Sequence, residues 1–266
     1  MAIKTSKLSA GYRGKSIIHQ VSMKIPKGSF CTIIGTNGCG KSTLLKALSR
    51  NLVPIKGSIE IEGKNILDYN SKVLARKLAY LSQSPYIPSQ FSAADLVSCG
   101  RFPHSKWMSI LSPYDHKIID WAMKLTETSD FAHRELEHLS GGERQRVWIA
   151  MALAQEAEIL LLDEPTTHLD MAHQFQTLEF LQHLNREMGQ TILMAIHDIN
   201  HAARFSDHIF VFKNGYLLTQ GPPELTITKE VIKEAFSVNV KIIQDYENNC
   251  LNIIPLRGIK KACLFS

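Results

Sequence analysis

The apolar positions of this chain follow two kinds of pattern. Some short runs are apolar almost throughout, at residues 30–34, 159–162 and 191–196. Between about residues 85 and 155 the pattern becomes helical, with few strand signals. Continuous apolar runs separated by helical segments are typical of parallel strands that are covered on both faces. The pattern therefore predicts an α/β fold in which a helical subdomain is inserted at about residues 85–155.

The two ends of the chain carry weaker signals. Near the N-terminus, apolar and polar residues alternate as in a half-buried strand, with Val21, Met23 and Ile25 on the apolar side. Residues 229–236 predict a short helix, and residues 238–243 predict a strand. From Arg257 the sequence is basic, and we expect a loose tail. We therefore divide the chain into a main domain, residues 1–240, and a C-terminal strand and tail, residues 241–266.

Composition narrows the class of protein. The 266 residues are 44% apolar and 21% charged, as in ordinary globular proteins. The net charge of +5 is mild and no Lys/Arg block is present, so nothing in the charge suggests a nucleic-acid partner. The five cysteines are odd in number and none form a C-x-x-C pair, which favours reduced thiols in the cytosol over disulfides or zinc.

No segment of the sequence resembles a secretory signal or a membrane span. Residues 1–16 are polar and basic, without an apolar centre. The longest apolar stretch, residues 147–162, is interrupted by Gln155, Glu156 and Glu158, and so falls short of the run of about 20 apolar residues that a span needs. If this protein serves a membrane, we expect another chain to cross it.

The first chemical motif fits the pattern G-x-x-x-x-G-K-[ST]. Its residues are Gly35, Thr36, Asn37, Gly38, Cys39, Gly40, Lys41, Ser42 and Thr43. Glycines allow backbone N–H groups to point at phosphate oxygens, and the helix that follows offers its positive end to the same anion. We expect Lys41 to bridge the β- and γ-phosphates of ATP, Ser42 to bind Mg²⁺ and Thr43 to lie near the α-phosphate. A chance match is the alternative, but the motif follows a predicted strand and opens a predicted helix.

The second motif places two carboxylates at the end of a buried strand. The apolar run at residues 159–162 is followed by Asp163, Glu164 and Pro165. Open α/β sheets bind ligands at the carboxyl ends of their strands. We expect Asp163 to hold Mg²⁺ directly or through water, and Glu164 to act as the general base toward the attacking water. By itself the motif is also compatible with an acidic turn after a strand.

The third motif is a Ser-Gly-Gly turn before a helix. Ser140 suits a helix N-cap, which needs no functional explanation. The cap does not explain Gly141 and Gly142, which would make a second phosphate-binding cradle at the start of the helix. One chain that binds one ATP has little use for two such cradles.

Together these motifs resemble those of the nucleotide-binding subunit of the ABC transporter family, over about residues 1–240. Residues 139–145 resemble its LSGGQ signature, with Glu143 in place of Gln. The resemblance implies the ABC ATPase fold: a P-loop NTPase core, an antiparallel β subdomain and an inserted helical subdomain. It also implies a homodimer in which Ser140, Gly141 and Gly142 of one subunit close on the γ-phosphate bound by the other.

The resemblance assigns four further residues. Tyr12 corresponds to the aromatic residue that stacks on adenine, and Gln83 to the Q-loop glutamine, which implies contact with the metal and the catalytic centre. Asp170 matches the D-loop aspartate, and His197 the switch histidine. Three of them have a plainer alternative: a half-buried tyrosine, a solvated loop glutamine, or one of eleven ordinary histidines. His168 departs from the small residue that many members carry before Leu-Asp, which leaves the local dimer contact open.

Within the family, several segments resemble importers of iron(III)-siderophores, haem and vitamin B12. They lie at residues 100–104, 146–155, 163–170 and 197–204. This implies a peripheral subunit on the cytoplasmic face of the cell membrane, bound to integral permease subunits and indirectly to a substrate-binding protein. Residues 84–104 would form part of the cleft for a permease helix, although Arg101 and His104 also suit an exposed polar loop. The alternative function is a soluble ABC ATPase, such as the one of iron–sulfur cluster assembly.

Cys39 adds one further hypothesis. It lies inside the phosphate loop, where alkylation would block nucleotide binding by bulk; the plainer interpretation is that a small residue fits there.

Overall fold

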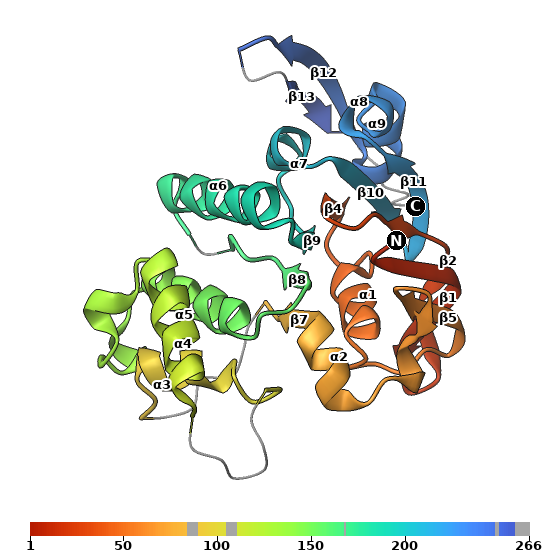
Figure 1. Ribbon diagram of the computed structural model, residues 1–266. Helices are drawn as coiled ribbons and strands as arrows, with labels where there is room; N and C mark the ends of the chain where they lie inside the picture. Colours follow the sequence, from red (N-terminus) through yellow and green to blue (C-terminus); the bar gives the residue numbers. More distant parts are fainter. Residues whose placement is uncertain (84–89, 105–110, 168, 248–249, 259–266) are drawn as a thin grey trace.

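A six-stranded sheet forms the centre of the protein (Figure 1). The computed structural model describes residues 1–83, 90–104, 111–167, 169–247 and 250–258. The strand order is β11-β10-β4-β9-β8-β7, and all neighbours are parallel except β10 and β11. The strands are β4 (Phe30–Gly35), β7 (Leu78–Leu81), β8 (Ile159–Asp163), β9 (Thr191–Ala195), β10 (His208–Lys213) and β11 (Tyr216–Gly221). The α/β class that the apolar runs predict is confirmed.

Both faces of this sheet are buried, which explains why its strands are apolar throughout. Successive side chains of a strand point to opposite faces, so Phe30 and Ile34 of β4 belong to one core and Cys31 and Ile33 to another. Helices α6 (Met171–Met188) and α7 (Ile199–Phe205) cover the first face, and α1 (Lys41–Leu48) covers the second.

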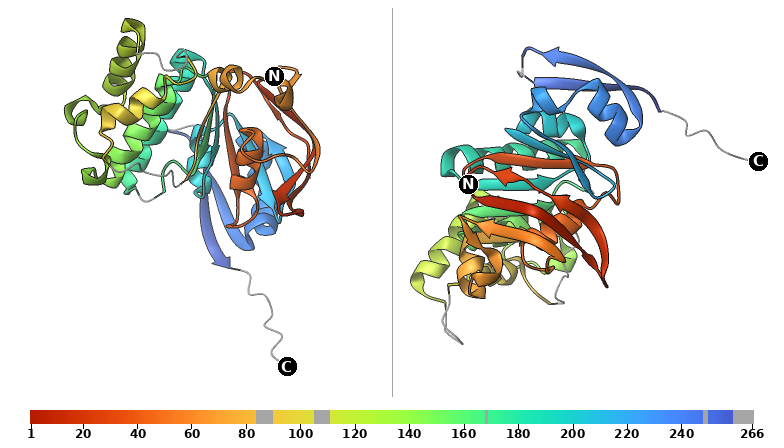
Figure 2. Two further views of the ribbon diagram at one scale, coloured as in Figure 1. Left: turned by 90° about the horizontal axis from the view of Figure 1, so that it is seen from below. Right: turned by 90° about the vertical axis from the view of Figure 1, so that its right-hand side faces the viewer.

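A second, antiparallel sheet packs on the far side of α1. It has the order β2-β1-β5-β6, and β3 pairs with β1. Its strands are β1 (Ile3–Tyr12), β2 (Lys15–Val21), β3 (Lys24–Ile25), β5 (Lys56–Ile61) and β6 (Lys64–Asn65), followed by the 3₁₀ turn η1 (Ile66–Asp68) and by α2 (Ser71–Lys77). Apolar residues of this sheet, α1 and the central sheet share one core, so α1 is held between the two sheets (Figure 2).

The helical subdomain lies beside the β7–β8 edge of the central sheet (Figure 2). It contains α3 (Ala93–Cys99), α4 (Pro113–Leu125), α5 (Gly141–Ala154), and the 3₁₀ turns η2 (Ser129–Phe131) and η3 (Leu136–His138). Each α-helix begins with a serine that exchanges hydrogen bonds with an acidic residue three positions later, at Ser92, Ser112 and Ser140. These capping boxes define the three helix starts.

Arg101 is the most deeply buried charge of this subdomain among the described residues. Its side chain is 1% exposed; Nε donates to Asp115 at 2.8 Å, and Nη1 donates to Glu156 at 2.7 Å and to the carbonyl of Ala154 at 2.6 Å. His104 also bonds the carbonyl of Gln155 at 2.9 Å. The exposed polar loop considered as an alternative for Arg101 is therefore wrong, because α4 and the end of α5 enclose this side chain.

The chain ends in a small unit that packs against α7. After α8 (Pro223–Thr226) and α9 (Lys229–Phe236), strands β12 (Val238–Asp245) and β13 (Cys250–Gly258) form an antiparallel hairpin. Helix α9 coincides with the helix predicted at residues 229–236. The predicted strand is one arm of this hairpin, whereas most of the predicted tail, residues 259–266, lies outside the described residues.

Within the described part of the chain, no helix is long and apolar enough to cross a membrane.

Candidate nucleotide-binding and hydrolysis site

The glycine-rich segment joins β4 to α1 at the carboxyl end of β4, an interior strand of the central sheet. Gly40 has a φ of 107°, and a Cβ atom there would come within 2.7 Å of Cγ2 of Ile18. Only glycine combines this backbone conformation with so close an approach. Lys41 is 4% exposed, and its Nζ donates to the carbonyl of Gly35 at 3.1 Å. The side chain of Lys41 therefore closes the loop by bonding its first glycine, six residues earlier.

The first carboxylate after β8 meets the hydroxyl group that opens α1. Ser42 Oγ donates to Asp163 Oδ1 at 3.0 Å, across 121 residues of sequence. Asp163 is 3% exposed, and this burial raises its pKa, while the bond from Ser42 acts in the opposite direction. A buried carboxylate with a raised pKa gains from a cation beside it.

The second carboxylate is held by residues at the carboxyl ends of β7 and β9, the two strands that flank β8. Glu164 is 9% exposed and has a φ of 55°, and its N–H donates to the carbonyl of Ala195 at the end of β9 at 3.0 Å. Gln83 Nε2 donates to Glu164 Oε2 at 2.5 Å, and His197 Nε2 lies 2.5 Å from Glu164 Oε1. A non-glycine residue with positive φ is sterically costly and persists where its surroundings fix it.

A cavity of about 360 Å³ opens over these groups. It is lined by Ile17, Asn37, Gly38, Gly40, Lys41, Ser42, Thr43, Gln83, Glu164 and His197. The phosphate loop and the carboxyl ends of β7, β8 and β9 thus face one space. Backbone N–H groups of the loop and the Lys41 ammonium group suit a polyphosphate, and a carboxylate paired with an imidazole, as in Glu164 and His197, is able to transfer protons.

The residues at the junction of α1 and β8 also fit a divalent cation. Mg²⁺ is bound through oxygen, by one or two protein groups together with substrate phosphates and water. The Ser42 hydroxyl and the Asp163 carboxylate offer two such oxygens that already lie 3.0 Å apart. The third expected ligand, Gln83, has its amide nitrogen bonded to Glu164.

Cys39 belongs to the phosphate loop, but its thiol does not line the cavity. The residue is 2% exposed, and a Cβ atom added to Gly35 would come within 2.7 Å of its sulfur. Burial also raises the pKa of this thiol. We therefore assign Cys39 to the site through its backbone alone.

The signature segment faces a different space in the same chain. Ser140 caps α5, accepting a bond from the N–H of Glu143 at 3.3 Å while its own N–H bonds Glu143 Oε2 at 2.8 Å. The bond from the Ser140 N–H is the largest of the interactions that lower the pKa of the Glu143 carboxyl group. A Cβ atom added to Gly141 would meet no atom of the described residues within 4 Å, so this start of α5 is open.

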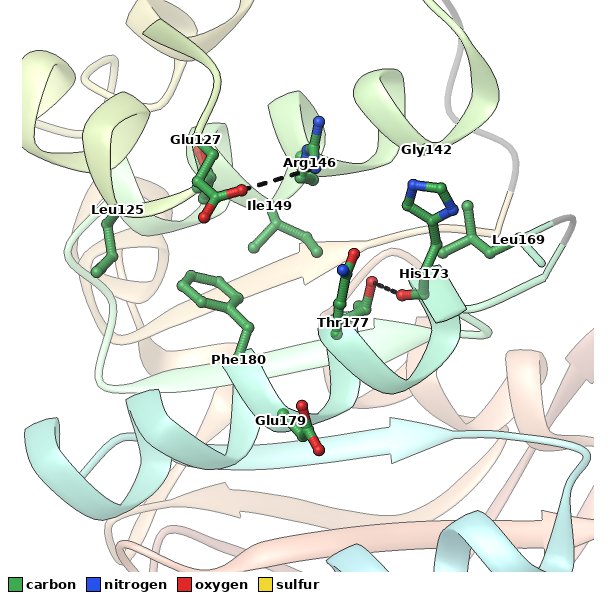
Figure 3. A pocket seen from close by; sticks show the side chains of 12 residues that line it. Leu125, Glu127, Gly142, Arg146, Ile149, Leu169, His173, Thr177, Glu179 and Phe180 are labelled. Atoms are coloured by element: carbon green, nitrogen blue, oxygen red, sulfur yellow. Dashed lines mark hydrogen bonds and ion pairs between the residues drawn. The ribbon is translucent and has the colours of Figure 1, made fainter. Parts of the chain in front are cut away.

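Gly142 lines a second cavity, of about 260 Å³, between α5 and α6 (Figure 3). His173 and Leu169 lie beside Gly142, and Arg146 pairs with Glu127 at 3.9 Å. The described residues that line this cavity include none of the phosphate loop. Within one chain, the structure therefore does not bring Ser140, Gly141 or Gly142 to the phosphate loop.

Two other expected site residues also stand apart from the phosphate cavity. Asp170 caps α6, accepting bonds from the backbone N–H of His173 at 2.9 Å and from its Nδ1 at 2.8 Å, which lower its pKa. Tyr12, at the end of β1, is 43% exposed, with Lys46 Nζ 5.9 Å from its ring centroid. This exposure leaves its ring accessible to a planar group. His168 lies outside the described residues.

The fold adds two residues that are not among the expected site residues. Thr167 donates from Oγ1 to Glu164 Oε2 at 3.3 Å. Burial raises the pKa of Tyr80 in β7, and the negative charge of the nearby Asp163 raises the pKa of this tyrosine further. The spacing of Thr167, one turn after Glu164, could have indicated its role; the position of Tyr80 depends on the pairing of β7 with β8.

Comparison with known proteins agrees with this geometry. The sequence profile described as ABC transporter matches residues 18–167. The chain is 45% identical over 263 residues to the iron(3+)-hydroxamate import ATP-binding protein FhuC of Bacillus subtilis (strain 168), covering 98% of both chains.

Two solved structures have closely similar folds. One is described as an inward-facing conformation of a putative metal-chelate type ABC transporter, with a TM-score of 0.84 and 27% identity, covering 96% of this chain and 98% of that one. The other is the dimeric, post-hydrolysis ATP-binding cassette MJ0796 bound to ADP and Pi, with a TM-score of 0.74 and 28% identity, covering 83% and 98%. The phosphate loop, the paired carboxylates and this similarity along nearly the whole chain lead to one conclusion: the protein belongs to the ABC transporter family, as one of its ATP-hydrolysing subunits.

Proposed function

We propose that this chain is the ATPase of an importer that carries an iron(III)-siderophore or a related metal chelate. The similarity to a hydroxamate-import subunit along 98% of both chains is the observation that supports this cargo. That similarity favours import over the soluble alternative of iron–sulfur cluster assembly. The cargo itself would be selected by permease and substrate-binding subunits, with this chain peripheral on the cytoplasmic face of the membrane.

The separation of the two glycine-rich segments supports a head-to-tail homodimer. The phosphate loop and the start of α5 face different cavities in one chain, and Ser140 and Gly141 are exposed. A second copy that places its Ser140-Gly141-Gly142 turn over the phosphate cavity would complete the site. Asp170 would lie at the same contact. Binding of ATP would then join the subunits, and hydrolysis would release them, a two-state cycle that a permease can follow.

The chemistry we propose follows from the groups around the phosphate cavity. Lys41 and the N–H groups of the loop would neutralise the phosphate oxygens. A Mg²⁺ ion held by Ser42 and Asp163, with Gln83 nearby, would supply further charge neutralisation. Glu164 would accept a proton from the attacking water, and His197 would orient that carboxylate. Tyr12 would stack on the adenine ring.

Reconstitution with the permease tests this function. The subunit, its copurified permease and the binding protein would be placed in vesicles, and uptake of labelled ferric hydroxamate would be followed with Mg²⁺ and ATP. Uptake should require ATP and should fail with the Glu164→Gln subunit or with EDTA. Copurification with a soluble scaffold protein, and no stimulation of the ATPase by loaded binding protein, would contradict an import role.

A further inference from the structure

The C-terminal hairpin is packed against the helix that follows His197. Val240 of β12 and Ile253 of β13 are 6% and 3% exposed, and they belong to the same apolar core as Ala202 and Phe205 of α7. In Figure 1 the hairpin lies next to α7, at the end of the molecule away from the helical subdomain. The hairpin is therefore part of the core on this face of the sheet, and it packs directly against α7.

One side chain of α7 completes the free edge of the hairpin. The Nδ2 group of Asn200 donates to the carbonyl of Ile253 at 3.2 Å, and the N–H of Ile253 donates to Asn200 Oδ1 at 2.7 Å. The carboxamide thus bonds both backbone groups of one β13 residue, as a neighbouring strand would. Only one orientation of the amide satisfies both bonds, which engage the N–H and the carbonyl of the same residue.

His197 depends on its neighbours for its position. Its side chain is 44% exposed, so packing on the imidazole itself restrains it little. On one side, the N–H of Ile196 bonds the carbonyl of Ile33 at 3.2 Å. On the other side, Asp198 caps α7 by accepting bonds from the N–H groups of Asn200 and His201, at 2.7 and 3.2 Å. The turn that carries His197 is therefore held from two sides, by β4 and by the first turn of α7.

We propose that Asn200 is a positioning residue for ATP hydrolysis: by bonding Ile253, it uses the C-terminal hairpin to hold His197 against Glu164. The path runs from the β13 backbone through the Asn200 carboxamide and the Asp198 cap to the His197–Glu164 contact of 2.5 Å. The inference rests on the role proposed above for His197, and not on the identity of the cargo.

The test compares Asn200→Ala with Asn252→Ala in the full-length protein. Asn252 is an exposed neighbour of Ile253 on the same strand, so its substitution controls for changes in the hairpin. For Asn200→Ala we expect kcat to fall about tenfold, with the KM for ATP unchanged within about twofold, because a small misplacement affects the transition state more than binding. Asn252→Ala should keep both constants. An increase in KM alone, or an unchanged kcat, would overturn the proposal.

A double-mutant cycle distinguishes positioning from a general loss of structure. In a His197→Ala background, Asn200→Ala should change kcat by less than about twofold, since the group it positions is gone. The same tenfold loss in both backgrounds would show that Asn200 acts on stability or elsewhere. Asn200→Asp, which keeps the acceptor for the Ile253 N–H but loses the donor, provides a near-isosteric variant should the alanine protein not fold. It should also lower kcat without raising KM, and a wild-type kcat would again contradict the proposal.

These assays use the purified subunit with ATP and Mg²⁺, without permease or cargo, so failure of this inference is separate from failure of the import function. A His197→Ala protein with wild-type kcat would overturn both the role of His197 and that of Asn200, while leaving the cargo experiment unaffected.

Discussion

His197 Nε2 lies 2.5 Å from Oε1 of Glu164, and the other oxygen of that carboxylate accepts a bond from Gln83, also at 2.5 Å. The three side chains lie at the carboxyl ends of β9, β8 and β7, which are adjacent strands. A carboxylate oxygen has two lone pairs, so Oε1 keeps one for a water molecule. The two bonds therefore fix the orientation of the Glu164 carboxylate and leave a lone pair of Oε1 that can accept a proton.

Glu164→Gln removes the proposed base while nearly preserving the shape of the side chain. General-base catalysis contributes about 10²–10⁴-fold, and we expect kcat to fall by that amount. The phosphate loop is untouched, so ATP should still bind and dimers should persist with ATP. Single-turnover hydrolysis and size-exclusion chromatography with ATP measure the two properties. Hydrolysis at a near wild-type rate would show that another group is the base.

His197→Ala should lower kcat more than it raises the KM for ATP. The imidazole contacts Glu164 and lines the phosphate cavity, and loss of one such preorganised group costs about 10²-fold in rate. The matched control is His183→Ala, because His183 is exposed on α6. Steady-state ATPase assays of both variants provide the comparison. Equal losses in the two proteins would argue against a specific role for His197.

Arg101→Ala should destabilise the protein. It would leave the carboxylates of Asp115 and Glu156 without their cation, and removing one partner of a buried ion pair costs about 3–5 kcal/mol. Chemical denaturation followed by circular dichroism measures the free energy of unfolding. Arg186→Ala, at an exposed position of α6, is the control and should change this value little. A loss below about 1 kcal/mol would contradict the structural role assigned to Arg101.

Cys39 should be modified slowly. Its thiol is buried and has a raised pKa, so it is neutral and inaccessible near pH 7. We expect iodoacetamide to label the less buried Cys250 before Cys39, with faster labelling as pH rises and the thiolate forms. Mass spectrometry of digests gives the order. Rapid labelling of Cys39 at neutral pH would contradict its burial; whether the modified loop loses ATP binding can be measured on the slowly labelled fraction.

Features of this protein that depend on local chemistry were predictable from its residues. Continuous apolar runs predicted parallel strands because both faces of the sheet are covered. The glycines before Lys41 predicted a tight turn between a strand and a helix, and Ser140 predicted the start of α5, because dihedral preferences and capping act over a few residues.

The contacts between distant residues depend on the packing of the whole fold. The bonds from Ser42 to Asp163, from Gln83 to Glu164 and from Asn200 to Ile253 span between 53 and 121 residues. They depend on strand order and on helix packing, which no local pattern specifies. Arg101 is the clearest example: a polar residue after a glycine suits an exposed loop, yet Asp115 and Glu156 neutralise its charge and allow its burial. Motifs in the sequence identified the phosphate loop, the carboxylates and the histidine. Long-range packing determined which of these groups share a cavity.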